Sequence, residues 1–289
     1  AVLTHDPGMY PKRLIVDEVR QMGITIAPLD VNASDSVYRV EDHGNAIRIA
    51  LSTVAGISDG EVQSIIAGRP YIDLNDFVRR SGSSTPITES MILTGAFDAL
   101  HTGVNRRDLL LHFSDLQKSP SAAVSGAQMN LGFEPPALIS SGLPAMSPAE
   151  SVKYEVDRLG IDMSRHMIEF YGDFLNAIGA VRSNDLLKQR SQSSVLVAGI
   201  KVAMQTPPVR SGKRVIFVTL DDGYGLSDST FFTDVQGEYA NVLYSTSLLL
   251  VRGVTRRTGA RGISIRATGA WDLRAAYESW STKQSTLAI

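Results

Sequence analysis

The chain contains no cysteine among its 289 residues. This absence excludes disulfide bonds, a thiol nucleophile and cysteine-ligated zinc, and it fits a reducing cytoplasm. No apolar run reaches the roughly 18 residues that cross a bilayer. The first residues, from Ala1 to Pro7, include neither an initiator methionine nor the basic and apolar regions of a secretory signal. We therefore expect a cytoplasmic protein, and the chain start is typical of the interior of a longer one.

Motifs of catalytic sites are also lacking. The five histidines form no His-Glu-x-x-His or His-x-His grouping, and no Gly-x-x-x-x-Gly-Lys phosphate loop is present. Asp221-Asp222-Gly223 resembles a carboxylate pair, but its place between two extended runs favours a turn. The sequence therefore predicts no catalytic residue, no metal site and no cofactor in this chain.

Charge is distributed unevenly along the chain. The formal net charge is -2, yet the segment from Val195 to Arg274 contains ten Lys or Arg and six acidic residues, which leaves the remainder at -6. Such asymmetry is typical of a segment that binds nucleic acid or another anionic partner, although a basic solvated surface has the same composition. With 43% apolar residues and this length, the chain is expected to form two or more globular domains.

Hydrophobic periodicity changes from helical to extended along the sequence. The first 116 residues contain helical stripes, as over residues 10–23, and from Ala46 to Arg80 they predict two short helices joined by a Gly-containing turn. Five apolar runs rich in β-formers follow, with a helical stretch between the third and the fourth: residues 195–204, 213–220, 226–232, 247–255 and 261–268. This order is that of an OB-fold, a five-stranded β-barrel. The predicted class is α+β and multidomain, a helical helix-hairpin-helix region followed by the barrel.

Proline, serine and glycine divide these regions. A stretch rich in all three separates the helical part from a second helical segment, which Ser147 opens as an N-cap. The expected domains are a helix-hairpin-helix region with the end of a preceding domain, a linker, a helical connector, the OB-fold and a C-terminal tail: residues 1–116, 117–146, 147–190, 191–275 and 276–289.

The segment from Val54 to Ile66 is typical of a helix-hairpin-helix. In this motif a glycine-rich turn brings backbone N–H groups close to a DNA phosphate, at the start of a helix. The expected DNA contacts are Gly56, Ile57, Ser58 and Gly60. Ser58 stands where the pattern usually has a second glycine, and a packing element without a ligand is the alternative.

The barrel segment carries cations and aromatic residues. OB-folds bind single strands through a cationic groove with aromatic stacking platforms. Phe217, Tyr224, Phe231 and Phe232 are the candidate platforms, and alternation places one ring of the Phe pair inside the barrel and one outside. The expected DNA contacts are Lys201, Arg210, Lys213, Arg214, Phe217, Arg252, Arg256, Arg257 and Arg261. A solvated hairpin on a protein-binding barrel is the alternative.

The linker contains Gln128-Met129-Asn130-Leu131-Gly132-Phe133. This spacing is that of short peptides that dock on the bacterial sliding clamp, where Leu131 and Phe133 fill an apolar pocket and Gln128 forms oriented hydrogen bonds. Apolar linker residues packed on a neighbouring domain would have the same composition.

Several longer matches resemble one family, the bacterial DnaE-type polymerases, also called the C family or DNA polymerase III alpha subunits. Leu93-Thr94-Gly95-Ala96-Phe97-Asp98 is similar to the end of their helix-hairpin-helix region. The matches that resemble the error-prone, ImuC-like branch, best represented in actinobacteria, are Gln205-Thr206-Pro207-Pro208, Arg210-Ser211-Gly212-Lys213-Arg214 and Leu249-Leu250-Val251-Arg252-Gly253.

The resemblance implies a parent nucleotidyltransferase that uses Mg²⁺ in damage-induced, mutagenic translesion synthesis and repair. The family's catalytic carboxylates precede the part that this chain resembles, so the chain is expected to be inactive alone. It would position primed duplex and single-stranded template DNA near the nucleoid and recruit an ImuB-like protein and the sliding clamp. The alternative is an interaction scaffold for ImuB or the clamp with negligible DNA affinity.

Overall fold

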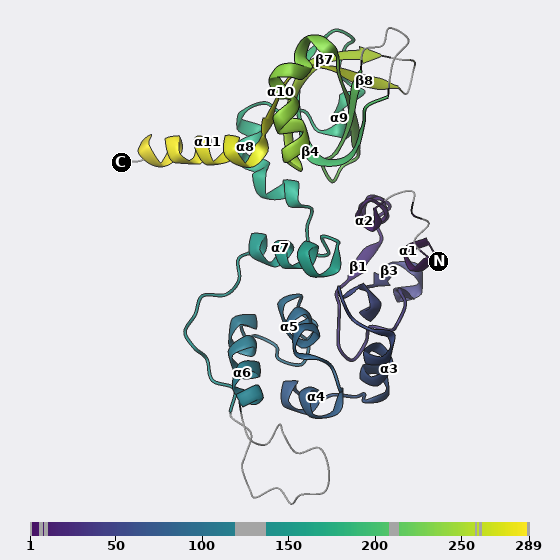
Figure 1. The fold of residues 1–289 in the computed structure, drawn as a ribbon, viewed down its shortest axis with the longest axis vertical. Coiled ribbons are helices and arrows are strands. Elements are labelled where there is room, and N and C mark those ends of the chain that lie inside the picture. Colours follow the sequence, from purple (N-terminus) through teal and green to yellow (C-terminus); the bar gives the residue numbers. More distant parts are fainter. Residues whose placement is uncertain are drawn as a thin grey trace, which may run out of the picture. The chain divides into compact units, whose positions relative to one another are not determined.

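The computed structural model describes residues 2–5, 8, 11–118, 137–207, 214–257, 259 and 262–287. The chain divides into two compact units, Ala1–Arg165 and His166–Ile289 (Figure 1). The first unit is mainly helical and the second contains a closed β-barrel, so the predicted α+β class is confirmed.

The first unit combines helices with a small sheet. In chain order its elements are α1 (Val2–His5), α2 (Lys12–Gln21), β1 (Thr25–Ala27), β2 (Arg39–Glu41), η1 (Asp42–Gly44), β3 (Ala46–Arg48), η2 (Leu51–Thr53), α3 (Asp59–Ala67), α4 (Leu74–Arg80), α5 (Thr85–Leu93), α6 (Arg106–Lys118) and α7 (Pro148–Leu159). Strand β3 pairs with β1 in parallel and with β2 antiparallel. The expectation of a helix from Ala46 was wrong, because residues 46–48 form β3, the central strand of this sheet. Only the short helix η2 lies between β3 and the hairpin turn.

Aromatic side chains form the centre of the first unit's core. Phe77 of α4 lies edge-on to Tyr71 at 5.0 Å and to Phe97 at 4.9 Å between ring centroids. Edge-to-face pairs of this kind add stabilisation beyond the burial of their area. The three rings join α4 to the residue segments that precede α4 and follow α5. They belong to the same core cluster as Val54 and Val62, which flank the hairpin turn.

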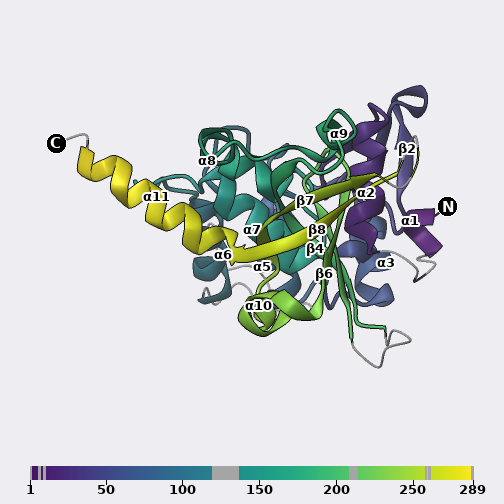
Figure 2. The ribbon, with the colours of Figure 1, turned by 90° about the horizontal axis from the view of Figure 1, so that it is seen from above.

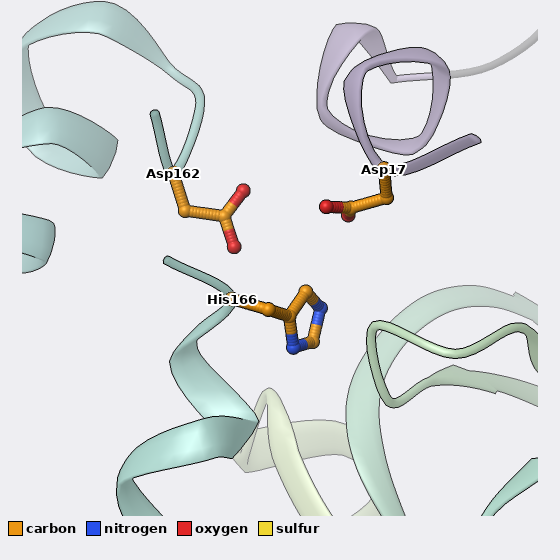
Figure 3. A group of neighbouring side chains, drawn as sticks. All are labelled: Asp17, Asp162 and His166. Carbon is orange, nitrogen blue, oxygen red and sulfur yellow. The ribbon is translucent and has the colours of Figure 1, made fainter. Parts of the chain in front are cut away.

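Two of the buried acidic side chains of the first unit lie close together (Figure 3). The carboxylates of Asp17 on α2 and Asp162 after α7 face one another, with oxygens within 4.8 Å. Arg20 donates to Asp17 Oδ1 at 2.6 Å and to the Met163 carbonyl at 2.8 Å, and it also donates to the Asp162 carbonyl. The guanidinium therefore holds α2 on the segment that follows α7 and balances buried negative charge.

The described end of the predicted linker lies on α6. Asp108 accepts a hydrogen bond from the backbone N–H of Ser141 at 3.0 Å, and Asn105 donates to the Leu143 carbonyl at 2.9 Å. Arg107 then pairs with Glu150 at 2.8 Å, beside the capping box that Ser147 and Glu150 form at the start of α7. This part of the linker is thus held by side chains of the helix before it.

The second unit is a barrel with short helices before it and a long one after it. In chain order its elements are η4 (Met167–Tyr171), α8 (Gly172–Ala177), α9 (Ser183–Leu186), β4 (Ser194–Gln205), β5 (Ile216–Asp221), β6 (Leu226–Phe231), α10 (Thr233–Ser245), β7 (Leu248–Arg257), β8 (Ile263–Asp272) and α11 (Leu273–Leu287). The strand order is β4-β5-β6-β8-β7, closed by pairing of β7 with β4. Figure 2 shows β7 beside β8, which continues directly into α11.

This topology confirms the OB-fold prediction. Five strands close with a parallel contact between β6 and β8, and helix α10 connects β6 to β7, the third strand to the fourth. Alternation along β6 places Phe231 fully inside, while Phe232 after it is 38% exposed. The expected division of this aromatic pair is therefore confirmed.

Asp221-Asp222-Gly223 forms the turn between β5 and β6. The Gly223 N–H donates to Asp221 Oδ1 at 2.9 Å, and the Tyr224 N–H donates to Asp222 Oδ1 at 3.0 Å. Asp222 also accepts from the Ser183 hydroxyl at 2.6 Å, and the ring of buried His166 lies 3.6 Å from Asp221. The two carboxylates serve the turn and its packing, as the turn prediction states.

Two histidines of the first unit, the half-buried His101 and the buried His112, pack against the start of α4. His101 Nε2 accepts a hydrogen bond from the Leu74 N–H at 3.0 Å, and His112 Nε2 lies 2.6 Å from Asn75 Oδ1. Desolvation by burial lowers the pKa of both imidazoles, and the neighbouring His101 lowers that of His112 further. Both side chains are therefore held neutral in the folded state.

Acid should destabilise the fold through these histidines. Because their folded pKa values lie below the unfolded value of about 6.5, the unfolded chain binds more protons once the pH falls below that value. The free energy of unfolding should then drop by at most about 1.4 kcal/mol per pH unit for each histidine. Denaturant titrations between pH 8 and 5 measure this dependence.

His101→Gln should make that dependence shallower, because a glutamine oxygen can accept from the Leu74 N–H without titrating. His43→Asn, at an exposed position outside this contact, is the matched control variant. An equal slope for wild type and His101→Gln would contradict this assignment.

Candidate nucleic-acid interface

The predicted hairpin turn lies between η2 and α3. Gly56 takes a φ of +83°, which a residue without Cβ adopts at little cost, and this reverses the chain. Gly56, Ser58 and Gly60 are exposed, while Ile57 is half-buried against the core. The structure thus brings the four predicted contacts together in one exposed turn anchored by Ile57.

Glu61 occupies part of this turn. Its Oε2 accepts from the Ser58 N–H at 3.0 Å, and its Oε1 accepts from the Ser84 N–H at 3.0 Å and the Ser84 hydroxyl at 2.7 Å. These hydrogen bonds lower the pKa of Glu61 to about 2. The Ser58 hydroxyl caps α3 in return, so Ser58 stands in place of the usual glycine as one half of a capping box.

The glycines retain free donors in the turn. Within the described part of the chain, the backbone N–H groups of Gly56 and Gly60 form no hydrogen bond. Gly60 lies in the first turn of α3, a nine-residue helix whose dipole favours an anion at its start, and Gly56 lies three residues before that helix. The ionised carboxylate of Glu61 offsets part of this attraction, so contact with a phosphate depends on the two glycine donors.

A second turn joins α5 to α6. Gly95 has a φ of +86°, and the Arg106 guanidinium lies so close that a Cβ at this position would fall 2.2 Å from its Nη2. Arg106 pairs with Asp98 at 2.6 Å and donates to the Leu93 carbonyl at 3.1 Å. This arginine therefore closes the end of α5 and fixes the Leu93–Asp98 segment of the family match.

In the barrel, exposed candidates lie on two different faces. Phe217 of β5 is 42% exposed, and Arg214 just before β5 is exposed as well. Arg252 and Arg256 lie on the outer side of β7, where alternation turns their side chains to solvent. Among the described residues, Arg214 and Phe217 are thus separated from Arg252 and Arg256, because β5 and β7 adjoin β4 on opposite sides.

Two of the predicted cations are engaged by the fold. Lys201 donates to the Leu243 carbonyl in the last turn of α10, and desolvation by burial lowers its pKa. Arg257 donates to the Leu187 carbonyl, just after α9. Cations at helix C-termini satisfy carbonyl groups that lack partners within the helix. These two side chains therefore stabilise the fold, whether or not they also contact DNA.

The remaining predicted contacts lie outside the described residues. They are Arg210, Lys213 and Arg261 in the two loops of the barrel, and Gln128, Leu131 and Phe133 of the clamp-binding peptide.

Sequence reasoning missed an aromatic and a basic residue on β8. Trp271 is 37% exposed, and the Arg252 guanidinium lies 5.3 Å from its ring centroid. Arg266 lies over the ring of Phe232 at 5.5 Å. Alternation along β8 gives a signal for Arg266 only, because Trp271 lies five residues later and would fall on the opposite face. Trp271 faces outward because the register of β8 with β7 shifts between these two residues.

Within the residues that the structure describes, no helix combines the length and apolar character needed to cross a membrane.

A helix-hairpin-helix region and an OB-fold barrel in one chain define a class of modular proteins whose elements commonly contact nucleic acid. The family model described as a helix-hairpin-helix motif matches residues 23–109. Among solved structures, asparaginyl-tRNA synthetase from Pyrococcus horikoshii is 19% identical with a TM-score of 0.27, over 33% of this chain and 23% of that one. The mitochondrial single-stranded DNA binding protein Rim1 of S. cerevisiae is 14% identical with a TM-score of 0.24, over 29% of this chain and 97% of that one.

Curated relatives extend along both units. The error-prone DNA polymerase of Symbiobacterium thermophilum is 28% identical over 92% of this chain and 29% of its own length. That of Bdellovibrio bacteriovorus is 26% identical over 88% of this chain and 25% of its length. The DNA polymerase III subunit alpha of Vibrio cholerae is 27% identical over 97% of this chain and 26% of its length.

The resemblance seen in the sequence is thereby confirmed: the chain is homologous to the bacterial error-prone and DNA polymerase III alpha polymerases of the DnaE type. It spans between a quarter and a third of the length of these relatives.

Gly95→Ala should destabilise the first unit more than Gly103→Ala. Both glycines have a φ near +80°, so each alanine carries a similar left-handed backbone cost of about 1–2 kcal/mol. Only at Gly95 would the Cβ also displace the Arg106 guanidinium, whereas space around Gly103 is open. Loss of the Arg106 contacts should add roughly 1–3 kcal/mol, measured by chemical denaturation. Equal costs for the two variants would show that Arg106 does not depend on this close approach.

Proposed function

We propose that this chain is a non-catalytic region of an error-prone DNA polymerase that acts in damage-induced translesion synthesis, where it positions DNA and recruits partners. The alignment with error-prone relatives along 88–92% of the chain, across both units, is the observation that carries this proposal. The helix-hairpin-helix region contacts the primed duplex, and the barrel contacts the single-stranded template.

The local chemistry of the two units supports this division. The hairpin offers one backbone donor in the turn and one in the first turn of the following helix, suited to a phosphate on a regular duplex. The barrel offers exposed arginines and aromatic rings, suited to unpaired bases and the backbone of a single strand.

The finer parts of the proposal concern the parent protein. It is a DNA-directed nucleotidyltransferase of the cytoplasm and nucleoid, and Mg²⁺ belongs to its catalytic palm rather than to this chain. An ImuB-like protein and the sliding clamp are its proposed partners, the clamp through the peptide containing Gln128, Leu131 and Phe133.

Binding of labelled DNA to the full chain, followed by fluorescence anisotropy in a salt series, tests the proposal. Phosphate contacts release counterions, so the logarithm of the binding constant should fall linearly with the logarithm of salt concentration, with a slope of about -0.7 per contact for a single strand and -0.9 for duplex. Salt-sensitive binding to primed duplex and single strand is expected. Absence of binding at low salt would overturn DNA positioning and favour the ImuB scaffold.

The hairpin contact can be tested without loss of stability. Gly60→Asp adds an acid at the start of α3, where the helix dipole and the removal of a helical glycine both favour the fold, and its Cβ has open space. The same carboxylate should repel a phosphate and weaken duplex binding several-fold. Gln63→Glu adds equal charge on the exposed side of α3 beyond the turn and is the matched control. Equal affinities for the two variants would remove the hairpin from the interface.

A further inference from the structure

A groove crosses the outer side of the barrel between α10 and the β7–β8 pair. Its volume is about 590 Å³, and its lining includes Phe232, Val254, Arg256, Arg266 and Thr268. Helix α10 forms one wall and β7 the other, with β8 between them. All of these elements belong to the barrel unit.

The aromatic rings along this surface are each paired with an arginine. Arg266 lies over Phe232 in the groove, and farther along β8 Arg252 lies over Trp271. A guanidinium that stacks through its face keeps its in-plane N–H donors free for a phosphate. Each pair therefore presents a stacking surface and an anion donor at the same place.

The indole of Trp271 packs closely over a glycine of its own strand. The register places Gly269 opposite Arg252, and a Cβ on Gly269 would fall 2.7 Å from Trp271 Cη2. Tyr239 of α10 meets the indole edge-on at 6.0 Å. The ring is thus fixed in position before any ligand binds, which lowers the entropic cost of stacking.

The charge of the surface favours a polyanion. Arg256 forms no hydrogen bond or ion pair with any described residue, and the pair between Arg266 and Asp234 is more than half exposed on both sides. Exposed pairs of this kind exchange readily for another anion. Strands β7 and β8 carry four arginines, Arg252, Arg256, Arg257 and Arg266, and these exceed the three acids of β8 and α10, which are Asp272, Asp234 and Glu238.

The face that usually binds oligonucleotides in OB-folds has a different composition here. That face is formed by the second and third strands, which are β5 and β6 in this barrel. Neither strand contains Lys or Arg, and Asp228 lies on its outer side, where it accepts from Thr219 at 2.7 Å. Phe217 is an exposed ring on this face without a cation on either strand.

We propose that single-stranded DNA runs along the α10/β7–β8 groove, with bases stacked at Phe232 and Trp271 and phosphates on Arg252, Arg256 and Arg266. Arg266, which lies over Phe232, is five residues from Trp271 on β8, or about 17 Å at the usual rise of a strand. The rings of Phe232 and Trp271 can therefore stack with two separate bases. This inference rests on the proposed single-strand role of the barrel and names the surface that performs it.

Tryptophan fluorescence tests the path directly. The chain contains two tryptophans, Trp271 and Trp280. Trp280 of α11 packs against Tyr277 of the same helix and Phe174 of α8. In Trp280→Phe, Trp271 is the sole emitter, and a single-stranded oligonucleotide should quench it with the same midpoint as the anisotropy titration. In Trp271→Phe the remaining Trp280 signal should not change. Fully paired duplex of the same sequence should not quench Trp271, because its bases are stacked.

Paired variants test the contributions of charge and stacking. Arg252→Ala with Arg256→Ala should lower the single-strand salt slope by about 1.4, whereas Arg274→Ala with Lys283→Ala removes equal charge from exposed positions of α11 and should not. Trp271→Ala should weaken binding by about 5- to 150-fold. Phe217→Ala should leave the affinity within about twofold.

The outcomes separate this inference from the proposed function. Salt-sensitive binding of wild type without quenching of Trp271, or a loss of affinity in Phe217→Ala alone, would overturn the groove and leave the barrel's DNA role intact. No binding of any single strand by wild type would overturn both.

Discussion

Closure of the barrel by the pairing of β7 with β4 is the constraint on which the barrel unit depends. Seven consecutive residue pairs join the two strands, from Ser194 with Val254 to Ile200 with Leu248. Once the sheet has closed, every strand turns one side toward the barrel core, so alternation selects the side chains that fill it. Part of the outer side of β4 and β7 is covered by the flanking helices, where Ala198, Ile200, Leu248 and Leu250 are buried. Arg252 and Arg256 lie exposed on the outer side of β7, while Leu249 and Val251, which precede them, are part of the barrel core.

A different constraint shapes the hairpin of the first unit. One backbone donor of its turn, the Ser58 N–H, already binds Glu61, so a phosphate would contact the N–H groups of Gly56 and Gly60. The capping box with Ser58 makes the turn rigid before DNA arrives, at the cost of a negative charge beside the site. The hairpin therefore suits a supporting contact on a duplex that other regions also hold.

Much of this arrangement follows from local sequence patterns. Runs of β-branched residues and the helix between the third and fourth strands were sufficient to predict the barrel, and Asp221-Asp222-Gly223 was recognisable as a turn because such residues bond their own backbone. The division of Phe231 and Phe232 followed from alternation alone. Each of these features depends on residues close together in the chain.

The features that were not predicted depend on contacts between distant residues. Lys201 reaches a carbonyl of α10, 42 residues along the chain, so its basic charge gave no sign of a structural use. Trp271 meets Arg252 because of the register in which β7 pairs with β8, and this register shifts between Arg252 and Gly253. The strand at Ala46 pairs in parallel with β1, and a three-residue strand is too short for its period to differ from that of a helix.

The charge of the whole chain bears on how such a barrel could select its ligand. With a net charge of -2, long-range attraction for DNA is weak, and screening confines electrostatic contact to about 8 Å at physiological salt. Affinity must then come from groups that touch the strand. Guanidinium donors respond to salt, whereas stacking on Trp271 and Phe232 responds little, and every base has a face that can stack. A surface that combines both accepts any template sequence, and it favours unpaired bases over paired ones because only unpaired bases reach the rings.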